Sequence, residues 1–255
     1  MNPAQTSSLG DRKVTKNSVV VVAGMGEVGK PLCRILSRKF SCMAVDIKPI
    51  DVIEPCSVLH ICYPYSIRDY VGTTANYVRK YAPRLTVVNS TVAPGTTRQI
   101  QEAVGDSLVA YSPVRGKHAR MEQDMMRYKK FVGAPRLEAT RLALAHFSEA
   151  GFATDKFASV ELGELAKLLE TTYLGMLIAW AQEMERVAFR YGGSFEDVNV
   201  FIKEIDFLPA HVFPGEIGGH CVLPNIEILR SQVESKFLDM VLESNQLKQR
   251  MYAVA

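Results

Sequence analysis

Residues 18–46 constrain the fold of this 255-residue chain more than any other stretch. They begin with SVVVVA, an apolar and β-branched run that is typical of a strand buried on both faces of a parallel sheet. The glycine pattern GMGEVG follows directly, then apolar residues at helical spacing, and then a second strand, SCMAVD, that ends on Asp46. A GxGxxG turn between a strand and a helix, with an acid about 20 residues further on, predicts a dinucleotide-binding Rossmann fold.

The residues of this turn have different physical tasks. Gly24 permits the tight turn, Gly26 lets a pyrophosphate approach the backbone, and Gly29 lets the helix pack closely on the strand. The amides of Glu27 and Val28 open the helix, and the positive end of its dipole faces the phosphates. These five residues are the candidate phosphate contacts.

Asp46 bears on which dinucleotide is bound. Its carboxylate can accept hydrogen bonds from both ribose hydroxyls, and its charge would repel a 2′-phosphate, so the sequence favours NAD over NADP. Lys48 is a further candidate contact, and as a nearby cation it keeps NADP open as the alternative.

Strands and helices continue to alternate through the first half of the chain. Four further apolar runs are predicted to be strands, with amphipathic helices between them: 57–63, 85–90, 107–112 and 129–134. Such an alternation forms a parallel sheet whose ligands bind at the carboxyl ends of the strands. Tyr63, Pro64 and Thr91 leave strands at that edge and are therefore candidate contacts of the nicotinamide ribose, with ordinary strand-ending turns as the alternative.

Residues 156–191 are predicted to form one unusually long helix. Its middle, TTYLGMLIAWA, is apolar nearly all round, and such a helix is buried either as the spine of a domain or in a subunit interface. We expect a homodimer built on this helix, with burial inside a single monomer as the alternative.

The predicted fold class is α/β, with an N-terminal Rossmann domain of mainly parallel sheet followed by an all-α domain built on the long central helix. The expected parts are a flexible tail, an NAD-binding domain and a helical domain for dimerisation and substrate, at 1–17, 18–155 and 156–255.

Composition narrows the choice of partner and compartment. The chain carries 30 Lys and Arg against 27 Asp and Glu, a net charge of +3, which argues against a nucleic-acid partner. No run approaches the roughly 18 apolar residues of a membrane span. The first 17 residues lack the apolar stretch of a signal peptide, so we expect a cytoplasmic protein. The five cysteines have no CxxC spacing, which favours reduced thiols and no metal site.

Cys221 lies in FPGEIGGHCVLPN (213–225), a segment rich in glycine and proline. Backbone amides in such a loop can stabilise a thiolate and His220 adds positive charge, so Cys221 is a candidate nucleophile, with an inert loop cysteine as the alternative. On the long helix, Lys167 and Thr171 share one face because they are one turn apart.

Several motifs resemble those of the UDP-glucose/UDP-N-acetylmannosamine (nucleotide-sugar) dehydrogenase family. The most specific is PGEIGGHC, which lies C-terminal to a dinucleotide fingerprint and a lysine-bearing long helix. The other matching segments are NSTVAPGTT (89–97), YSPVR (111–115) and ELAK (164–167) with the TTY that follows it. The resemblance covers roughly residues 18 to 250 and ends where that family's third, nucleotide-binding domain would begin, so it predicts a truncated form without that domain.

The resemblance implies a chemistry and a role for each matching residue. In that family NAD oxidises a sugar C6 alcohol to an aldehyde, which a cysteine traps as a thiohemiacetal. A second hydride transfer gives a thioester, and water releases the acid. By this resemblance Cys221 is the nucleophile, Lys167 stabilises the developing oxyanion, and Thr91 helps to hold the catalytic water. Gly219 and His220, beside the cysteine, are implied substrate contacts.

Three positions depart from the family pattern. Thr171 stands where the family has asparagine, Asn225 replaces a carboxylate four residues after the cysteine, and Val114 replaces a glutamate linked to thioester hydrolysis. Asparagine and valine cannot take a proton at neutral pH. Thr171 and Asn225 remain candidate catalytic residues, and whether the oxidation is of two or four electrons stays open.

A basic stretch follows the predicted strand 107–112. Arg115, Lys117 and His118 are candidate contacts for a phosphate or carboxylate of the substrate, with a solvated loop as the alternative.

The leading hypothesis is an NAD-dependent oxidoreductase that oxidises a primary alcohol or aldehyde of a small anionic or sugar-like substrate through a thiohemiacetal on Cys221. The second is a two-electron dehydrogenase or reductase of the 6-phosphogluconate/β-hydroxyacid type, in which Lys167 relays the proton. The third is an NAD-binding subunit that has lost catalysis.

Overall fold

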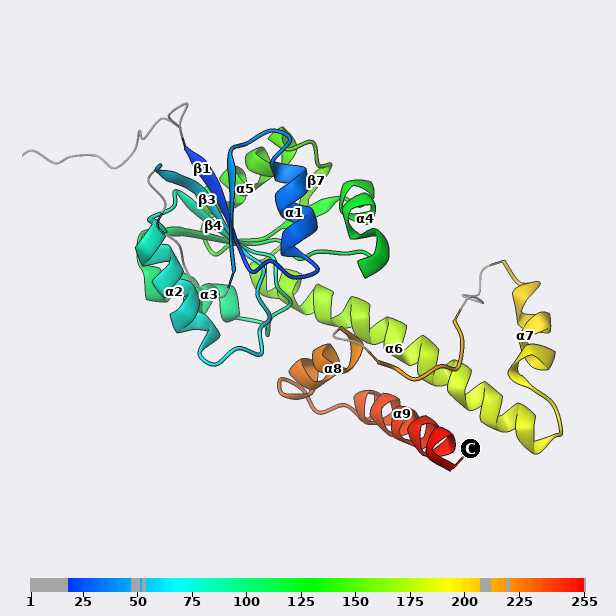
Figure 1. Ribbon diagram of the computed structural model, residues 1–255. Coiled ribbons are helices and arrows are strands. Elements are labelled where there is room, and N and C mark those ends of the chain that lie inside the picture. The colour runs from blue at the N-terminus through cyan, green and yellow to red at the C-terminus, as the bar shows by residue number, and fades with distance from the viewer. Residues whose placement is uncertain (1–17, 47–50, 52–53, 207–211, 219–220, 255) are drawn as a thin grey trace, which may run out of the picture. The chain divides into compact units, whose positions relative to one another are not determined.

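The computed structural model describes residues 18–46, 51, 54–206, 212–218 and 221–254 (Figure 1). The chain divides into two units, the first ending at Glu164 and the second beginning at Leu165. The predicted tail, residues 1–17, lies outside the described residues.

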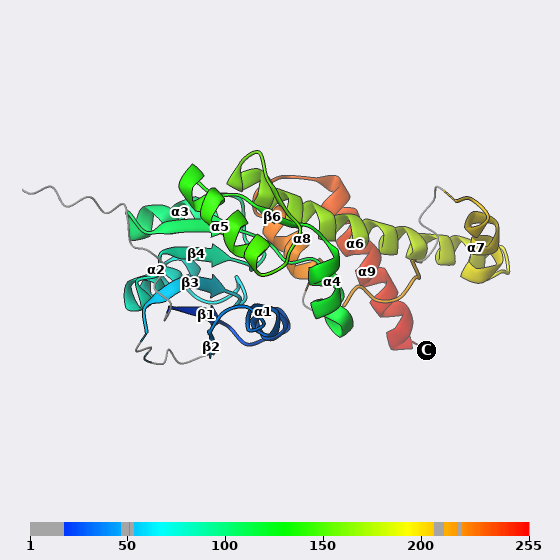
Figure 2. The same ribbon diagram turned by 90° about the horizontal axis from the view of Figure 1, so that it is seen from above.

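Five parallel strands form the sheet of the first unit, in the spatial order β2-β1-β3-β4-β5 (Figure 2). Their bounds are β1 (Val19–Ala23), β2 (Cys42–Val45), β3 (Cys56–Ile61), β4 (Leu85–Val88) and β5 (Leu108–Tyr111). Every residue of β1 is buried, as a central strand covered on both faces requires. The predicted fold class, an α/β chain with a parallel sheet, is confirmed.

Alternate valines of β1 face opposite sides of the sheet. Val20 and Val22 pack in one apolar cluster, whereas Val19 and Val21 pack in the other. The first cluster is covered by α1 (Gly29–Leu36), α4 (Met121–Arg127) and α5 (Leu137–Glu149), and the second by α2 (Tyr70–Tyr81) and α3 (Thr96–Val104). Figure 1 shows α1 and α2 on opposite sides of the strands.

The run 129–134 was expected to add a further strand to this sheet, and that prediction is wrong. β6 (Lys130–Val132) pairs in parallel with β7 (Thr154–Lys156) in a separate two-stranded sheet. Tyr111 of β5 meets Gly133 in an antiparallel bridge. Because this bridge sets the end of β6 antiparallel to β5, β6 cannot extend the parallel ladder.

The second unit is helical and contains most of α6 (Val160–Arg190), a helix of 31 residues. The helix begins later than predicted because residues 154–156 form β7. The other helices are α7 (Phe195–Lys203), α8 (Val222–Arg230) and α9 (Lys236–Val254). Leu168 of α6, Ile226 of α8 and Val241 of α9 belong to one buried cluster, which joins these three helices.

Candidate active site

The glycine turn after β1 is tightly packed at both of its ends. Gly24 has a φ of +94°, and a Cβ there would lie 2.5 Å from the amide nitrogen of Tyr63. A Cβ on Gly29 would lie 1.8 Å from the carbonyl oxygen of Gly24. A side chain at either position would overlap the backbone, so the turn can form only with glycine at both.

Gly26, between these two positions, faces open space. A Cβ built on it would meet no atom within 4 Å. Packing therefore does not require a glycine here, and the absence of a side chain keeps the backbone of the turn accessible. A cradle of this kind fits a pyrophosphate that approaches the main chain closely.

The N-terminus of α1 offers donors to such an anion. Val28 precedes the helix, and no side chain among the described residues caps this end. The first amides of a helix lack intrahelical acceptors, and the helix dipole places partial positive charge at the same point. An anion above Gly26 would find these amides directed towards it.

Asp46 lies beside the same turn. Its Oδ1 accepts a hydrogen bond from the amide of Met25, at 3.3 Å, and this contact holds the carboxylate at the end of β2. The ribose diol of a dinucleotide could be recognised there, so Asp46 fits the role expected of the acid in the fingerprint. Lys48, the other candidate on this segment, lies outside the described residues.

The carboxyl ends of β3 and β4 are joined at the predicted nicotinamide end. The Ser90 hydroxyl donates to the carbonyl oxygen of Tyr63 at 2.5 Å, next to Pro64 and Thr91. The Tyr63 side chain turns away, since its hydroxyl bonds to Thr74 of α2 at 2.7 Å and burial raises the pKa of the phenol. The backbone of Tyr63, and not its ring, lies at this edge.

Two residues of the basic stretch make separate local contacts. The guanidinium of Arg115 donates to the carbonyl oxygen of Lys129 at 2.7 Å and lies over the ring of Phe131. The amide of Lys117 donates to Asp124 at 2.9 Å, and this bond is the main cause of the lowered pKa of the Asp124 carboxyl. The Arg115 side chain and the Lys117 backbone are thus held in place, and neither contact involves the Lys117 ammonium.

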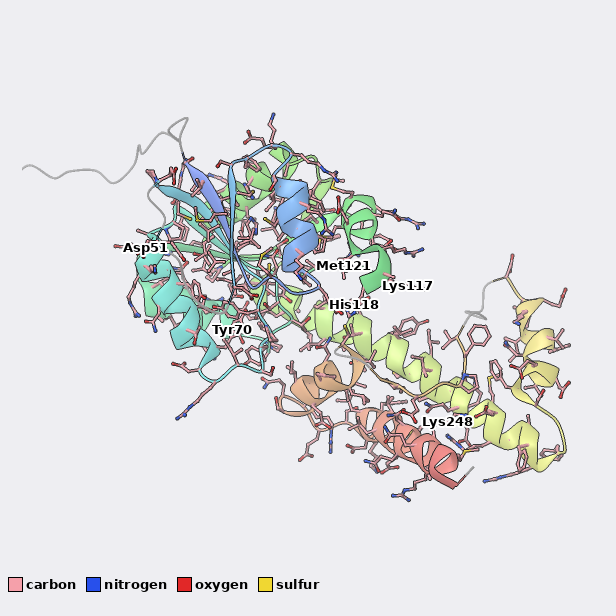
Figure 3. All side chains as sticks on the ribbon, in the orientation of Figure 1. Asp51, Tyr70, Lys117, His118, Met121 and Lys248 are labelled. Carbon is pink, nitrogen blue, oxygen red and sulfur yellow. The ribbon has the colours of Figure 1, made fainter. Side chains whose placement is uncertain are left out.

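His118 lies instead beside the glycine turn, in the single turn of 3₁₀ helix before α4 (Figure 3). Its Nδ1 is 2.6 Å from Oε2 of Glu27. A groove of about 870 Å³ runs between the turn, α1 and α4, and its lining includes Gly26, Lys30 and Arg34 together with this pair.

Four predicted catalytic residues lie in the second unit, and each contacts at least one of the others: Lys167, Thr171, Cys221 and Asn225. The Asn225 side-chain amide donates to the Thr171 hydroxyl at 3.0 Å, which joins α8 to α6. Thr171 also donates to the carbonyl oxygen of Lys167, one turn earlier. The Lys167 ammonium is 2.7 Å from Oε2 of Glu170, and only 12% of its side chain is exposed.

Cys221 is the N-cap residue of α8, one turn before Asn225. Its carbonyl oxygen accepts the amide of Asn225 at 3.1 Å, so both residues belong to the first turn of this helix. The positive end of a helix dipole favours a thiolate over a thiol. Gly219 and His220 lie outside the described residues, and Thr91 belongs to the first unit.

Glu164 has a role that the sequence did not indicate. Although fully buried, it accepts hydrogen bonds from the amide of Gly95 at 2.6 Å and from the amide and hydroxyl of Thr97 at 2.8 and 2.6 Å. It thereby caps α3 with a carboxylate supplied by α6. Burial nevertheless raises its pKa. The sequence offered one signal for this contact. Gly95 directly precedes a predicted helix and has no side chain that could cap it.

Comparison with known proteins shows similarity to nucleotide-sugar dehydrogenases. Residues 161–247 match the central domain of the UDP-glucose/GDP-mannose dehydrogenase family. Over 186 residues the chain is 26% identical to the UDP-N-acetyl-D-mannosamine dehydrogenase of Pyrococcus horikoshii, covering 67% of this chain and 43% of that protein. Residues 161–247 thus match this family's central domain, and most of the chain is similar to nucleotide-sugar dehydrogenases.

Two further comparisons with nucleotide-sugar dehydrogenases extend over more of the chain. The UDP-N-acetyl-D-mannosamine dehydrogenase of Methanocaldococcus jannaschii is 26% identical over 270 residues, covering 82% of this chain and 61% of that protein. The solved structure of the UDP-D-ManNAc dehydrogenase from Pyrococcus horikoshii aligns with a TM-score of 0.79 at 19% identity, covering 92% of this chain and 69% of that one. The chain thus spans less than two thirds of these two curated relatives.

The described residues show neither a metal site nor a membrane-spanning helix. Within the described residues, no group of three or more His, Cys, Asp or Glu side chains could hold a metal ion. None of the helices in the described part of the chain has the length and apolar character needed to cross a lipid bilayer.

Proposed function

We propose that this chain is an NAD-dependent oxidoreductase that acts on a primary alcohol or aldehyde of a small anionic or sugar-like substrate. The observation that carries the proposal is the open backbone cradle at Gly26, set between two glycines that packing requires and beside the Asp46 carboxylate. The dehydrogenases among its relatives give the same reaction class.

The first unit would hold the dinucleotide by its backbone. The amides of Glu27 and Val28 would bind the pyrophosphate, and Asp46 would accept bonds from the adenosine ribose. The carboxylate also disfavours a 2′-phosphate, which is why we propose NAD as the cofactor. When bound, NAD supplies the acceptor for the hydride that leaves the substrate carbon.

The second unit would supply the groups that act on the substrate. The Cys221 thiolate would add to the aldehyde carbon, and the Lys167 ammonium would stabilise the resulting oxyanion. Thr171 and Asn225, already bonded to one another, would orient substrate or water by hydrogen bonds. Neither side chain accepts a proton at neutral pH, so Cys221 and Lys167 are the ionisable members of this set.

Replacing the nucleophile tests the covalent route, and the yield of NADH gives the number of electrons removed from the substrate. In the Cys221→Ser variant we expect formation of acid from substrate to fall by about three orders of magnitude or more, because a serine hydroxyl is a far weaker nucleophile at neutral pH. The measurement is NADH formed per substrate consumed, with sugar and nucleotide-sugar primary alcohols and aldehydes as probes. The wild type is expected to form two equivalents from an alcohol.

Cys42→Ser is the matched control, since burial raises the pKa of the Cys42 thiol to about 11 and leaves it unreactive. The covalent route is wrong if the Cys221 variant still converts alcohol fully to acid. One equivalent of NADH in the wild type, with turnover that depends on Lys167, would instead favour the two-electron β-hydroxyacid type.

A homodimer is the proposed assembly, because α6 leaves an apolar stripe exposed. Large exposed apolar side chains recur three, four or seven positions apart along one line of this helix: Leu169, Tyr173, Met176, Trp180 and Val187. Trp180 alone has 64% of its surface exposed. A long apolar stripe on a surface helix is characteristic of a protein–protein contact, and a second copy of this helix presents the same surface.

The Trp180→Asp variant is expected to be a monomer under conditions in which the wild type is a dimer. A charge replacing an aromatic anchor in a two-fold interface costs about 2 kcal/mol or more per copy. Sedimentation equilibrium measures the change. Leu137→Asp, an exposed apolar position on the first unit, is the control that should leave the dimer intact. A wild-type monomer would refute the assembly.

A further inference from the structure

The first unit buries a lysine in its core. Lys130 of β6 is only 4% exposed, while its neighbour Lys129 has 60% of its side chain exposed and pairs with Asp155. A buried ammonium is costly unless oxygen acceptors surround it. Its position therefore indicates a specific set of partners.

Those partners lie at the ends of two sheet strands. The Lys130 Nζ donates to the carbonyl oxygen of Ser112 at 2.7 Å and to that of Pro113 at 3.0 Å, just beyond β5. It also lies 3.4 Å from Oδ1 of Asn89, just beyond β4. One ammonium therefore joins two adjacent strands at their carboxyl ends.

Asn89 is itself held from the other side. Its amide Nδ2 donates to the carbonyl oxygen of Val87 at 3.1 Å and lies 3.2 Å from Nδ1 of His60. Nε2 of His60 is in turn 3.0 Å from Nε2 of His146. With both imidazoles neutral, His60 accepts at Nδ1 and donates to His146, an assignment that follows from the bonding pattern. The amide of Asn89 thus has one orientation, with its oxygen towards Lys130.

The segments that follow these anchored residues are those of the candidate site. Ser90 and Thr91 come directly after Asn89, and Val114 and Arg115 come directly after Pro113. Ligands of a parallel sheet bind at this edge. Lys130 lies on β6, outside the main sheet, and its side chain is long enough to contact the ends of both β4 and β5. One residue can therefore set the spacing between the segments that follow these two strands.

We propose that Lys130 is a positioning residue for the nicotinamide end of the cofactor site, acting through Asn89 and the carbonyl oxygens of Ser112 and Pro113. The inference rests on the proposed function, because it assumes that NAD binds this unit. Lys130 itself touches neither substrate nor cofactor in this role. It holds the ends of β4 and β5 at the separation at which the nicotinamide half fits.

The test compares NAD with ADP-ribose, which lacks the nicotinamide. In Lys130→Met we expect the Kd for NAD to rise about tenfold, whereas the Kd for ADP-ribose stays within about twofold of the wild-type value. Isothermal titration measures both ligands. Loss of a structural core residue alone would weaken both, because both use the glycine turn and Asp46. Lys129→Met, at the exposed neighbour, should change neither.

Asn89→Leu is the second variant, for the case that Lys130→Met does not fold. It removes the side-chain acceptor and leaves the ammonium its two carbonyl oxygens, so the same selective loss of NAD affinity is expected. Equal Kd changes for the two ligands, or none in a folded variant, would overturn the positioning role. If the wild type does not bind NAD, the proposed function is wrong, and the inference about Lys130 is then wrong as well because it rests on that function. If neither variant folds, Lys130 serves stability and the inference is also wrong.

Discussion

Replacing Gly24 by alanine is expected to lower the unfolding free energy of the first unit by about 3 kcal/mol or more. The new Cβ would lie 2.5 Å from the Tyr63 amide nitrogen, and the backbone at +94° disfavours any side chain. Neither strain can be relieved by a rotamer change, since the obstructing atoms are main chain. Urea denaturation followed by circular dichroism measures the loss, and a stability equal to wild type would contradict the packing argument.

Gly26→Ala is the matched variant within the same turn, and it should separate folding from binding. Its Cβ meets nothing within 4 Å, so we expect stability within about 0.5 kcal/mol of wild type. The added methyl group would nevertheless occupy the cradle, so affinity for NAD should fall sharply. A stable Gly26→Ala variant that binds NAD as well as wild type would exclude this turn as the phosphate site.

Acid is expected to destabilise the first unit through its buried histidine pair. Burial lowers the pKa of His146 to about 4. Burial also lowers the pKa of His60, and the neighbouring His146 and Lys130 lower it further. The unfolded imidazoles take up protons near pH 6.5, whereas the folded ones do not. Stability is therefore complete above about pH 6.5 and is lost as the pH falls towards 4. His146 alone accounts for about 3 kcal/mol of this loss.

Hydrogen exchange of the β3 and β4 amides at pH 7 and pH 4.5 locates the effect in this unit. The His146→Phe variant keeps a ring against Phe40, which stacks on His146 at 4.8 Å, and should show a shallower dependence on pH. His118→Gln removes an exposed imidazole and is the control. An identical acid-induced loss in wild type and His146→Phe would show that the pair is not responsible.

The glycine turn was predictable in detail because its signals are local. The strand, the three glycines and Asp46 lie within 29 consecutive residues, and each glycine has a backbone reason that can be stated without a structure. The structure gives Gly24 and Gly29 the close contacts that were expected and leaves Gly26 open, as a phosphate approach requires. The common face of Lys167 and Thr171 followed equally from helical spacing.

Long-range contacts between polar residues were not predictable. Lys129 and Lys130 look alike as sequence, yet strand alternation exposes one and buries the other. Glu164 has the appearance of a surface acid on a helix until the N-terminus of α3 is known to lie against it. The bond between Thr171 and Asn225 joins residues 54 positions apart, and no local pattern encodes that distance.

The open cradle at Gly26 also bears on how this protein can evolve. Because main-chain amides would hold the phosphates, the side chains at Met25 and Glu27 can vary under selection without removing those donors. Recognition of the ribose would depend instead on one carboxylate, that of Asp46. If NAD binds here as proposed, a change of cofactor preference would require mutation at very few positions, while Gly24 and Gly29 stay under constraint from the fold itself.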